Sequence, residues 1–334
     1  MSIRFAAVGL NHNHIEALCN QLIGAGAELV WYYAKEPELA DGFGKKYPQG
    51  KPARSEDEVL EDSSIALVVS AGIPIDRAPL GIRVMQRGKD YSTDKPGFGT
   101  LEQLAEARRV QAETGRIYSV FYAERFDNRA TMKAGELVHS GAIGRVIQTV
   151  GLGPHRLGLV NRPDWFWHRQ NFGGIINDIA SHQMDQFMYF TSSTSAQVVA
   201  SQVANFNHPQ YPDFDDFGDV VVASDHATGY MRVDWFTPDG LGTWGDGRMT
   251  ILGTDGYIEL RKYIDVAGRP GGDHIFLVDK QGTRYIDGSQ TPLTYGKTLI
   301  ADVLNRTDTT MTQQHSLAAS ELALQAQAQA RRIR

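Results

Sequence analysis

Among the residues with the chemistry of proton transfer, we consider Lys95, Asp178 and His182 first. Oxidation of an alcohol requires a base that removes the hydroxyl proton, and histidine, whose pKa lies near neutrality, suits that task. Asp178 lies four residues before His182, so a helix would place both on one face, where the carboxylate could orient the imidazole or hold a second hydroxyl. Lys95 could donate to the reacting oxygen and stabilise alkoxide charge. The plainer alternatives are a carboxylate at a helix start, a core histidine and a surface lysine.

A second group of residues has the chemistry of a carbohydrate site. Planar polar side chains and aromatic rings together bind sugars, and the predicted substrate-binding residues are Glu124, His155, Arg156, Trp165, Trp167 and Asp185. The tryptophans could instead belong to the core or to a subunit interface. His155, Asp178 and His182 could also hold zinc together with a water, but their spacing is not diagnostic, so no metal site is predicted.

A turn with phosphate-binding chemistry begins at Gly9. A dinucleotide pyrophosphate needs free backbone N–H groups at a helix N-terminus, usually supplied by the pattern G-x-G-x-x-G, of which only the first glycine is present. Asn11 and Asn13 could adopt positive φ in place of the glycines, and Asn13 could cap the helix. The cofactor-binding residues predicted in this turn are Gly9, Leu10, Asn11, His12, Asn13 and His14. Taken alone, the turn is equally compatible with a βα connection that binds no ligand.

The end of the second expected strand bears on the choice of cofactor. An acidic residue there would hold the ribose 2′-hydroxyl of NAD, but Ala34 and Lys35 stand at this point. A lysine could hold a 2′-phosphate, so NADP is slightly favoured over NAD. The alternative is that Lys35 is a solvated surface residue and that Glu36 holds the ribose. Residues at or after later strands complete the predicted cofactor site: Ser70, Ala71, Arg77, Asp94, Lys95 and Pro96.

The elements that must position these residues alternate along the first part of the chain. Strands are predicted from apolar runs at residues 3–9, 29–34, 65–70, 90–93 and 117–122. Helical patterns separate them, which predicts a parallel sheet with helices on both faces and ligands at the carboxyl ends of the strands. We therefore expect Gly9, Ala34, Ser70 and Lys95 on one rim of one crevice.

The second half of the chain has a different pattern. Helices are predicted at residues 129–140, 175–190 and 313–331, and strands separated by Gly, Asp and Pro turns run from residue 196 to about residue 286. The predicted fold class is α/β. An N-terminal Rossmann domain (residues 1–123) has a doubly wound parallel sheet and binds the dinucleotide. A C-terminal α+β domain (residues 124–334) has an open, mostly antiparallel sheet for substrate binding and oligomerisation.

Two motifs in this order give the sequence a family resemblance. Asp94-Lys95-Pro96 follows the fifth strand, and Gly173-Gly174 opens a stretch that contains Asp178 and His182. Together they resemble the Gfo/Idh/MocA family (glucose–fructose oxidoreductase, inositol dehydrogenase and rhizopine catabolism), which typically has Glu-Lys-Pro and Gly-Gly…Asp-x-x-x-His. The resemblance covers nearly the whole chain. It implies NAD(P)-dependent oxidation or reduction of sugars and polyols, with Lys95, Asp178 and His182 at the catalytic positions.

The sequence departs from the family pattern at two points. The glycine loop is shortened, and the family's usual histidine after the fourth strand is replaced around Arg77. An NAD(P)-dependent dehydrogenase or reductase acting on a C–O bond of a sugar, polyol or sugar derivative is the favoured function. The alternative, favoured by the altered loop, is a sensor or regulatory protein that binds dinucleotide and sugar without turnover.

Composition narrows the partners and the location. The formal net charge of −6 argues weakly against nucleic acid as the main partner. The single cysteine, Cys19, permits no intramolecular disulfide and fits a reducing compartment. No apolar stretch approaches the ~18 residues of a membrane span, so we expect a cytoplasmic protein without a membrane partner.

Assembly is predicted from the expected antiparallel sheet. Apolar residues alternate along it at Val220, Val222, Met231, Val233 and Trp235. Because helices cover only one face of an open sheet and an exposed apolar face usually marks an interface, we expect a homodimer or homotetramer packed through the sheets.

Overall fold

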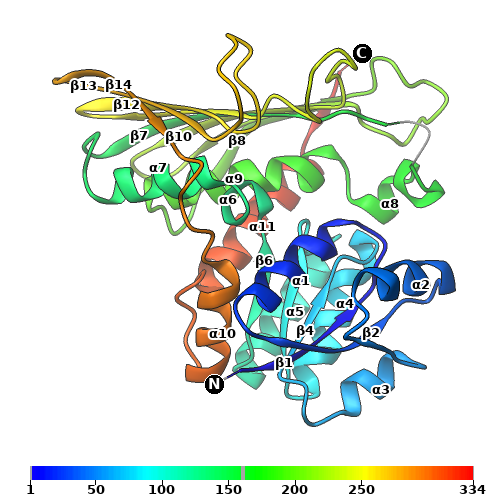
Figure 1. Cartoon of the computed structure of the whole chain (residues 1–334). Coiled ribbons are helices and arrows are strands. Elements are labelled where there is room, and N and C mark those ends of the chain that lie inside the picture. Colours follow the sequence, from blue (N-terminus) through cyan, green and yellow to red (C-terminus); the bar gives the residue numbers. More distant parts are fainter. Residues whose placement is uncertain (1, 159–161, 334) are drawn as a thin grey trace. The chain divides into compact units, whose positions relative to one another are not determined.

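A computed structural model describes residues 2–158 and 162–333 of the chain. The chain forms two compact units (Figure 1). The first comprises Met1–Phe121 and Thr294–Leu317, and the second comprises Tyr122–Leu293 and Ala318–Arg334. The sequence-based division placed residues 294–317 in the C-terminal domain, whereas in the structure this segment belongs to the first unit.

The first unit contains a parallel sheet of six strands in the order β3-β2-β1-β4-β5-β6. The strands are β1 (Arg4–Val8), β2 (Glu28–Tyr33), β3 (Lys51–Pro52), β4 (Leu67–Ser70), β5 (Asp90–Asp94) and β6 (Tyr118–Phe121). The strand order reverses between β1 and β4, and an open α/β sheet binds its ligand at the carboxyl ends of the strands at such a switch point. This confirms the predicted Rossmann arrangement.

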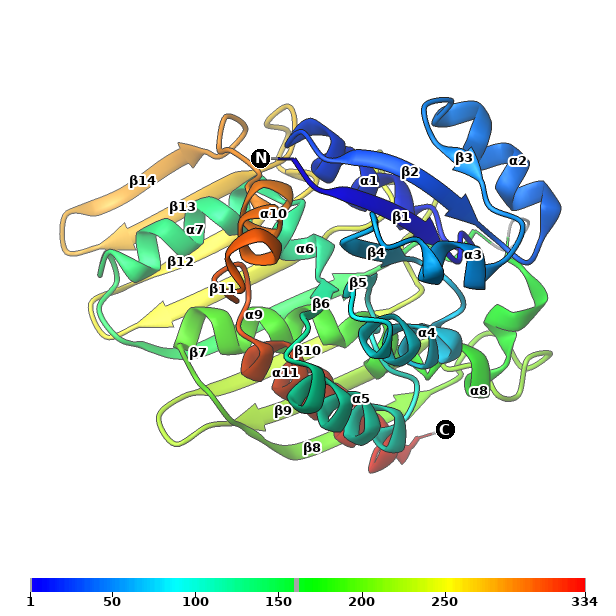
Figure 2. The same cartoon turned by 90° about the horizontal axis from the view of Figure 1, so that it is seen from below.

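The helices of this unit are α1 (His14–Gly24), α2 (Pro37–Lys46), α3 (Glu56–Glu61), α4 (Pro74–Gln86), α5 (Leu101–Thr114) and α10 (Tyr295–Asn305) (Figure 2). Right-handed crossovers that run in opposite directions from the switch point place α1 and α4 on opposite faces of the sheet. Gly81 of α4 packs against the rings of Tyr91 and Tyr118, because a Cβ there would lie 2.5–2.6 Å from them.

Helix α10 joins the first unit through polar contacts with β5 and β6. The Tyr295 hydroxyl lies 2.7 Å from the Ser92 hydroxyl and 2.9 Å from the Ser119 hydroxyl, all buried. Arg306, after the helix, pairs with the buried carboxylate of Asp90, with 2.5 and 2.9 Å contacts. These long-range partners explain why segment 294–317 packs with the N-terminal sheet although it follows the second domain in sequence.

The second unit contains a sheet of nine strands in the order β14-β13-β12-β11-β7-β10-β9-β8-β15. Neighbouring strands are antiparallel except for the pairs β7–β10 and β8–β15, which confirms a mostly antiparallel sheet. The strands are β7 (Val146–Pro154), β8 (Gln197–Ala204), β9 (Phe217–Ala223), β10 (Thr228–Asp234), β11 (Arg248–Gly253), β12 (Gly256–Arg261), β13 (His274–Asp279), β14 (Gly282–Asp287) and β15 (Arg331–Arg332).

Helices cover one face of this second sheet (Figure 1). They are α6 (Ala123–Phe126), α7 (Arg129–His139), α8 (Arg169–Phe172), α9 (Ser181–Thr191) and α11 (Gln313–Ala328), with a 3₁₀ turn η2 (Asp164–Trp167) and a π-helical turn η3 (Ile176–Ala180). The core between helices and sheet includes Ala134 of α7, Phe190 of α9, Met249, Ile258 and Ile275. Gly151 and Gly153 of β7 allow α9 to approach closely, because a Cβ at either position would lie 2.8–2.9 Å from the Gln183 side chain.

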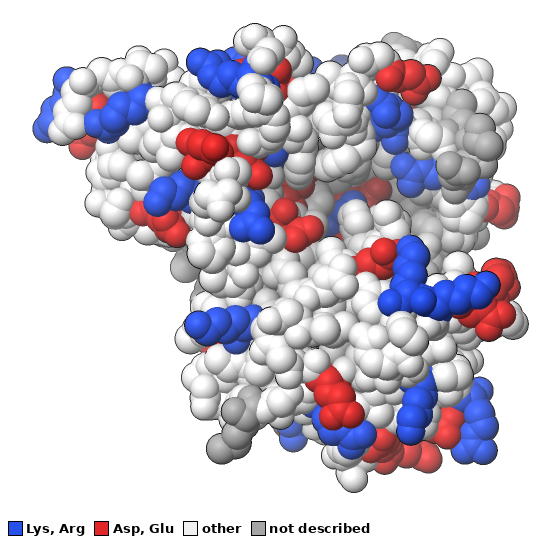
Figure 3. Space-filling model, viewed as in Figure 1, with Lys and Arg blue, Asp and Glu red and all other residues white. Residues whose placement is uncertain are grey.

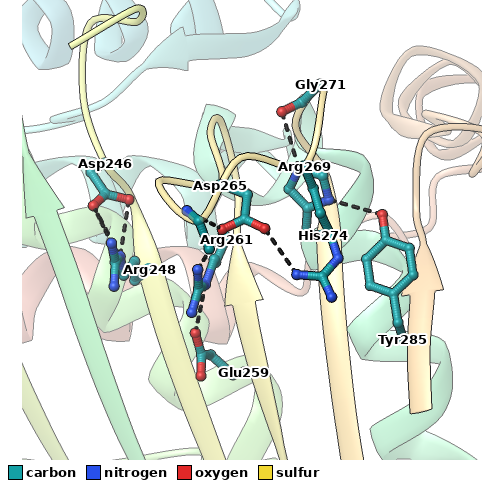
Figure 4. A network of polar contacts seen from close by, with 10 residues as sticks. Asp246, Arg248, Glu259, Arg261, Asp265, Arg269, Gly271, His274 and Tyr285 are labelled. Carbon is teal, nitrogen blue, oxygen red and sulfur yellow. Dashed lines mark hydrogen bonds and ion pairs between the residues drawn. The ribbon is translucent and has the colours of Figure 1, made fainter.

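The opposite face of this sheet, here called the open face, carries the alternate residues of the strands. Figure 4 shows part of it: Asp246 binds Arg248, and Arg261 joins Glu259 to Asp265, which also holds Arg269. The exposed Leu252, Tyr257 and Tyr285 lie on the same face. By contrast, the residues from which assembly was predicted are 0–6% exposed, so they cannot form an exposed interface: Val220, Val222, Met231, Val233 and Trp235.

Two surface observations bear on partners. Lys and Arg are interspersed with Asp and Glu on the face shown in Figure 3, without one large basic patch there. In the described part of the chain, no helix is long and apolar enough to cross a membrane.

Candidate functional site

A cavity of about 270 Å³ lies at the carboxyl ends of β1, β2 and β4. Its lining residues include Gly9, Asn11, Ala34, Lys35, Glu36 and Ser70, so this crevice gathers much of the predicted cofactor site. Gly9 has a φ of +77°, and a Cβ on it would lie 3.0 Å from both Gly72 Cα and Ser70 Oγ. A glycine is therefore required at position 9, where the chain leaves β1 and packs against the segment that follows β4.

The segment after β2 presents a carboxylate to the turn that joins β1 to α1 (residues 9–13), here called the phosphate turn. The Asn11 side-chain amide donates to Glu36 Oε1 at 3.0 Å. Lys35 is exposed and Ala34 is buried, while Glu36 is half-buried at the start of α2. The alternative considered from the sequence, in which Glu36 takes the acidic position at the end of the second strand, thus has a structural basis.

The phosphate turn differs from the expectation at both asparagines. Outside glycine, the described residues with positive φ are Ser192, Asp273 and Arg306, so the prediction of positive φ at Asn11 and Asn13 is wrong. Asn13 makes no side-chain cap hydrogen bond either. Instead the His14 N–H donates to His12 Nδ1 at 3.2 Å. The imidazole of His12 therefore takes the capping role that was assigned to Asn13.

The two histidines of this turn adjoin Asp94 at the end of β5. Their rings lie 4.1 Å apart, and His14 Nδ1 lies 3.0 Å from Asp94 Oδ1. Burial by itself would raise the pKa of Asp94, but His14 and Arg77 outweigh it and hold that pKa well below its usual range. Burial, and after it the charge of His14, lowers the pKa of His12 well below the usual imidazole value. His12 is therefore neutral at neutral pH.

Arg77 holds the segment that carries Lys95. Its guanidinium is 1% exposed, pairs with Asp94 Oδ2 at 3.3 Å and donates to the carbonyls of Gly72, Asp94, Lys95 and Pro96. With its donors directed to protein acceptors, Arg77 has the geometry of a positioning residue rather than of a direct cofactor ligand. Lys95 is 6% exposed and precedes a cis peptide bond to Pro96.

The second unit contains a buried polar cluster around Glu124. Glu124 Oε2 accepts from Lys262 Nζ at 2.6 Å and from Gln183 Nε2 at 3.1 Å. Lys262 also donates to Gln186 Oε1 at 2.7 Å, and all four side chains are at least nine-tenths buried. Burial alone would raise the pKa of Glu124, but Lys262, followed by His182 and His155, lowers it to about 2. Glu124 is therefore an ionised carboxylate in a buried site.

One face of this cluster has hydrogen-bonding capacity left over. Glu124 Oε1 and Gln183 Oε1 are buried, and neither has a hydrogen-bond partner in the part of the chain that the structure describes. A buried acceptor without a partner is costly, so each such atom in a native structure calls for a ligand, an ion or a water. Two acceptor oxygens held this way suit the hydroxyl donors of a polyol.

His182 and Asp178 lie at the junction of the π turn and α9. Asp178 belongs to the π turn, and its N–H donates to Gly174 O at 2.8 Å. His182 is 2% exposed, has its ring centroid 6.3 Å from that of Tyr122, and acts electrostatically on Glu124. The sequence predicted one helix over residues 175–190, and the π turn within that span is a feature found often at functional sites.

His155 lies between two tryptophans. Its ring centroid is 5.4 Å from Trp235 and 4.6 Å from Trp244, and its Nδ1 is 3.1 Å from Gly153 O. The Nδ1–H therefore donates to that carbonyl. His155 also contributes to the lowered pKa of Glu124, so it belongs to the same electrostatic environment.

Other predicted substrate residues have protein partners instead. Both Asp185 oxygens accept from Arg125, at 2.6 and 2.8 Å, and Arg156 donates to the carbonyls of Pro238, Asp239 and Leu241. Trp167 stacks on Tyr211 with centroids 3.8 Å apart, within an aromatic cluster, while Trp165 is half-buried. These contacts favour positioning and packing roles for Asp185, Arg156 and Trp167.

Sequence reasoning missed Lys262, Gln183 and Gln186 as site residues, and it considered Glu36 only as the alternative to Lys35. The excess of polar residues between 175 and 190 was a usable signal, because Ser181, His182, Gln183, Asp185 and Gln186 are all 0–2% exposed. Lys262 had no comparable signal, since a lysine that follows a strand is ordinarily a surface residue.

Comparisons with known proteins agree with this fold. A family model described as the GFO/IDH/MocA C-terminal domain matches residues 131–259. The D-xylose dehydrogenase of Paenarthrobacter nicotinovorans is 25% identical over 154 residues, which cover 45% of this chain and 38% of that protein. The NAD⁺-dependent scyllo-inositol 2-dehydrogenase of Bacillus subtilis is 25% identical over 293 residues, covering 85% and 82% of the two chains.

Solved structures extend the likeness over the whole chain. A protein of Erwinia carotovora atroseptica, named only by its class as an oxidoreductase, is 47% identical with a TM-score of 0.96, covering 99% of this chain and 100% of that one. A levoglucosan dehydrogenase in complex with NADH has a TM-score of 0.76 at 16% identity, covering 98% and 97%, and shares the fold. From these matches and the two sheets described above, this chain belongs to the Gfo/Idh/MocA family of NAD(P)-dependent oxidoreductases.

Proposed function

We propose that this protein oxidises a secondary alcohol of a polyol or sugar, or reduces the corresponding ketone, with NAD as the cofactor. The observation that carries the substrate class is the buried carboxylate of Glu124, fixed by Lys262 and Gln183 with one acceptor oxygen left for a ligand. Relatives named for xylose and inositol dehydrogenation support the same class.

The preference for NAD rests on Glu36. A carboxylate after β2 accepts hydrogen bonds from ribose hydroxyls and repels a 2′-phosphate. Asn11 fixes Glu36 beside the phosphate turn, whereas Lys35, on which the slight preference for NADP was based, is exposed. Both NAD⁺- and NADP⁺-dependent inositol dehydrogenases occur among the relatives, so they leave the choice open.

The proposed roles follow from side-chain chemistry. A bound nicotinamide cofactor would supply the acceptor for the hydride of the alcohol carbon. The imidazole of His182 takes the hydroxyl proton, so that hydride and proton loss together convert the alcohol to a ketone. Lys95 stabilises negative charge that develops on the substrate oxygen, and Asp178 orients His182 or a neighbouring hydroxyl. Glu124 binds a further hydroxyl and thereby orients the polyol.

A sensor that binds the same ligands without turnover is the second candidate. It is favoured by the turn at Gly9, where the N–H groups of Gly9 and His12 already donate to Tyr33 O and Ala71 O at 2.9 Å.

The cytoplasm, favoured by the single cysteine, remains the expected location.

The test combines binding with turnover. NADH and NADPH are titrated by fluorescence, and NAD⁺ turnover is then followed with a panel of inositols and aldoses. We expect NADH to bind more tightly than NADPH, and His182→Ala to lower turnover by roughly 10²–10⁴-fold with nearly unchanged NADH affinity. Tighter binding of NADPH would overturn the role of Glu36. Binding of NADH and a polyol without turnover would favour the sensor, and unchanged turnover of His182→Ala would exclude His182 as the base.

A further inference from the structure

Several backbone N–H groups of the phosphate turn, which would ordinarily bind a pyrophosphate, already have partners within the protein. A pyrophosphate at such a turn is ordinarily held by N–H groups that point at the ligand. Here the N–H groups of Gly9 and His12 donate to carbonyls of neighbouring segments, and the N–H of His14 donates to His12 Nδ1. These three groups are unavailable to a phosphate. Side chains of the turn can supply the interactions that these three N–H groups do not.

The imidazoles of His12 and His14 are the groups suited to that task. Because His12 Nδ1 accepts a hydrogen bond, the proton of the neutral ring is on Nε2, which is then a donor. His14 directs Nδ1 to Asp94, so its Nε2 becomes a donor when the ring is protonated. The His14 side chain is 33% exposed, whereas that of Asp94 is 1% exposed. A ligand can thus reach the imidazole, and the carboxylate behind it supports the positive charge.

The charges around this pair select an anion. The imidazole of His14 lies near His12 and pairs with Asp94, which Lys95 follows in the chain. The buried Arg77 also pairs with Asp94. The ligand atoms of His12, His14 and Asp94 fall within 4.8 Å of one another, a spacing that a metal ion could use. However, the charge of Asp94 is already offset by Arg77, and Lys95 adds a second cation, so the surroundings oppose a metal cation and attract an anion.

We propose that His14, with His12 as a neutral second donor, binds the dinucleotide pyrophosphate in place of the missing glycine N–H groups, so that cofactor binding takes up a proton at His14. This inference rests on the proposed dinucleotide-dependent function and names how that site recognises its ligand. No bond is made or broken in this step, and the proton comes from solvent.

Proton uptake fixes the sign of the pH dependence. The protonated ring donates a charge-assisted hydrogen bond to the pyrophosphate, so affinity is highest at low pH. Affinity falls as rising pH makes that proton less available, by at most about tenfold per pH unit for one proton. Asp94 stays ionised as pH rises, because a higher pH favours the carboxylate and the buried Arg77 remains paired with it.

The experiment uses ADP-ribose and adenosine as probes, with calorimetric titration of this 334-residue chain between pH 6 and pH 8.5. The pyrophosphate of ADP-ribose does not itself titrate in this range, and adenosine, which has no phosphate, serves as the comparison. We expect ADP-ribose to bind more weakly as pH rises and adenosine affinity to stay constant. His14→Gln should bind ADP-ribose on the order of ten- to a hundredfold more weakly at pH 6 and lose the pH dependence. The control is His139→Gln, which removes an exposed imidazole of α7 that contacts Tyr189 O and should behave as wild type.

The outcomes separate this inference from the proposed function. Binding of ADP-ribose with equal affinity at pH 6 and pH 8.5, or an unchanged pH profile in His14→Gln, would overturn the role of His14 while leaving dinucleotide binding intact. Failure of NADH and ADP-ribose to bind at any pH would instead contradict the proposed function. Tighter binding on addition of Zn²⁺, or its loss in EDTA, would show that the cluster holds a metal and would also overturn the inference.

Discussion

Glu124 illustrates how a single partner decides the state of a buried group. Its carboxylate is 2% exposed, and without Lys262 its burial would favour the protonated acid. With Lys262 at 2.6 Å it is an ionised acceptor, which is the form that can hold a substrate hydroxyl. The residue type was visible in the sequence. The partner, 138 positions away, was not.

We predict that Lys262→Met destabilises the protein more at pH 7 than at pH 5. The substitution leaves a buried carboxylate without its cation, which costs about 3–5 kcal/mol of unfolding free energy at neutral pH. In the wild type, a pKa of about 2 means that the contribution of Glu124 is present above the ordinary carboxyl range and is lost only as pH falls toward 2. In the variant the folded pKa rises above the unfolded value, so acid favours folding by protonating Glu124. Urea midpoints at both pH values measure the difference.

The matched control is the double variant Glu124→Gln with Lys262→Met. Removing both charges should recover most of the lost stability, since neither group is then buried alone. If Lys262→Met unfolds at the wild-type midpoint at pH 7, the ion pair does not have the energetic role assigned here.

Residue types proved easier to predict than residue roles. Gly9, Lys95 and His182 were singled out from motifs, and the structure places Gly9 at the cavity at the ends of β1, β2 and β4, and His182 beside Glu124. Asp185 and Arg77 were predicted as ligand contacts, but the one pairs with Arg125 and the other binds backbone carbonyls. Hydrogen-bonding capacity is shared between ligand and protein, and only the tertiary structure shows which partner takes it.

At the scale of elements, the alternation of strands and helices was sufficient to predict the first sheet. Local periodicity reports which residues are buried, and it did so for β1, β2, β4, β5 and β6. It did not report pairing between distant segments. The parallel pair β7–β10, the two residues of β15 and the docking of α10 on α1 depend on long-range contacts that have no local pattern.

Close packing of α10 on α1 gives a prediction at this scale. A Cβ at Gly296 would lie 2.1 Å from Gln21 O and 2.5 Å from Gln21 C, both backbone atoms of α1 that can move only with the helix. We expect Gly296→Ala to lower stability by roughly 1–3 kcal/mol through overpacking. Differential scanning calorimetry would record it as a lower unfolding temperature.

The control is Gly42→Ala in the exposed part of α2, where a Cβ has no neighbour within 4 Å. Alanine should stabilise that helix by about 0.5–1 kcal/mol, because it loses less backbone entropy than glycine. The two substitutions are chemically identical, so a common direction of change would contradict close α1–α10 packing as the cause.

At the scale of the whole molecule, the sequence predicted the open sheet but assigned the wrong residues to its free side. Alternation shows that strand residues divide between two faces, but it does not show which face the helices cover. Val220, Val222, Met231 and Val233 are the covered set. The open face is instead a mixture of ion pairs, such as Asp246–Arg248, and exposed rings, such as Tyr257 and Tyr285.

We still predict a homodimer or homotetramer that packs through the open face, now with different residues. Leu252 and Tyr257 are paired neighbours on β11 and β12, and they remain 37% and 41% exposed on a face that no helix of the second unit covers. Burial of such apolar side chains between two copies would contribute to assembly, and the surrounding ion pairs would set its register. Light scattering at micromolar concentration should give an oligomeric mass for the wild type and a monomeric mass for Leu252→Glu combined with Tyr257→Glu. Leu304→Glu on α10, at an equally exposed leucine (42%), should remain oligomeric because α10 belongs to the first unit. A monomeric wild type, or dissociation by Leu304→Glu, would show that the open face is not the assembly surface.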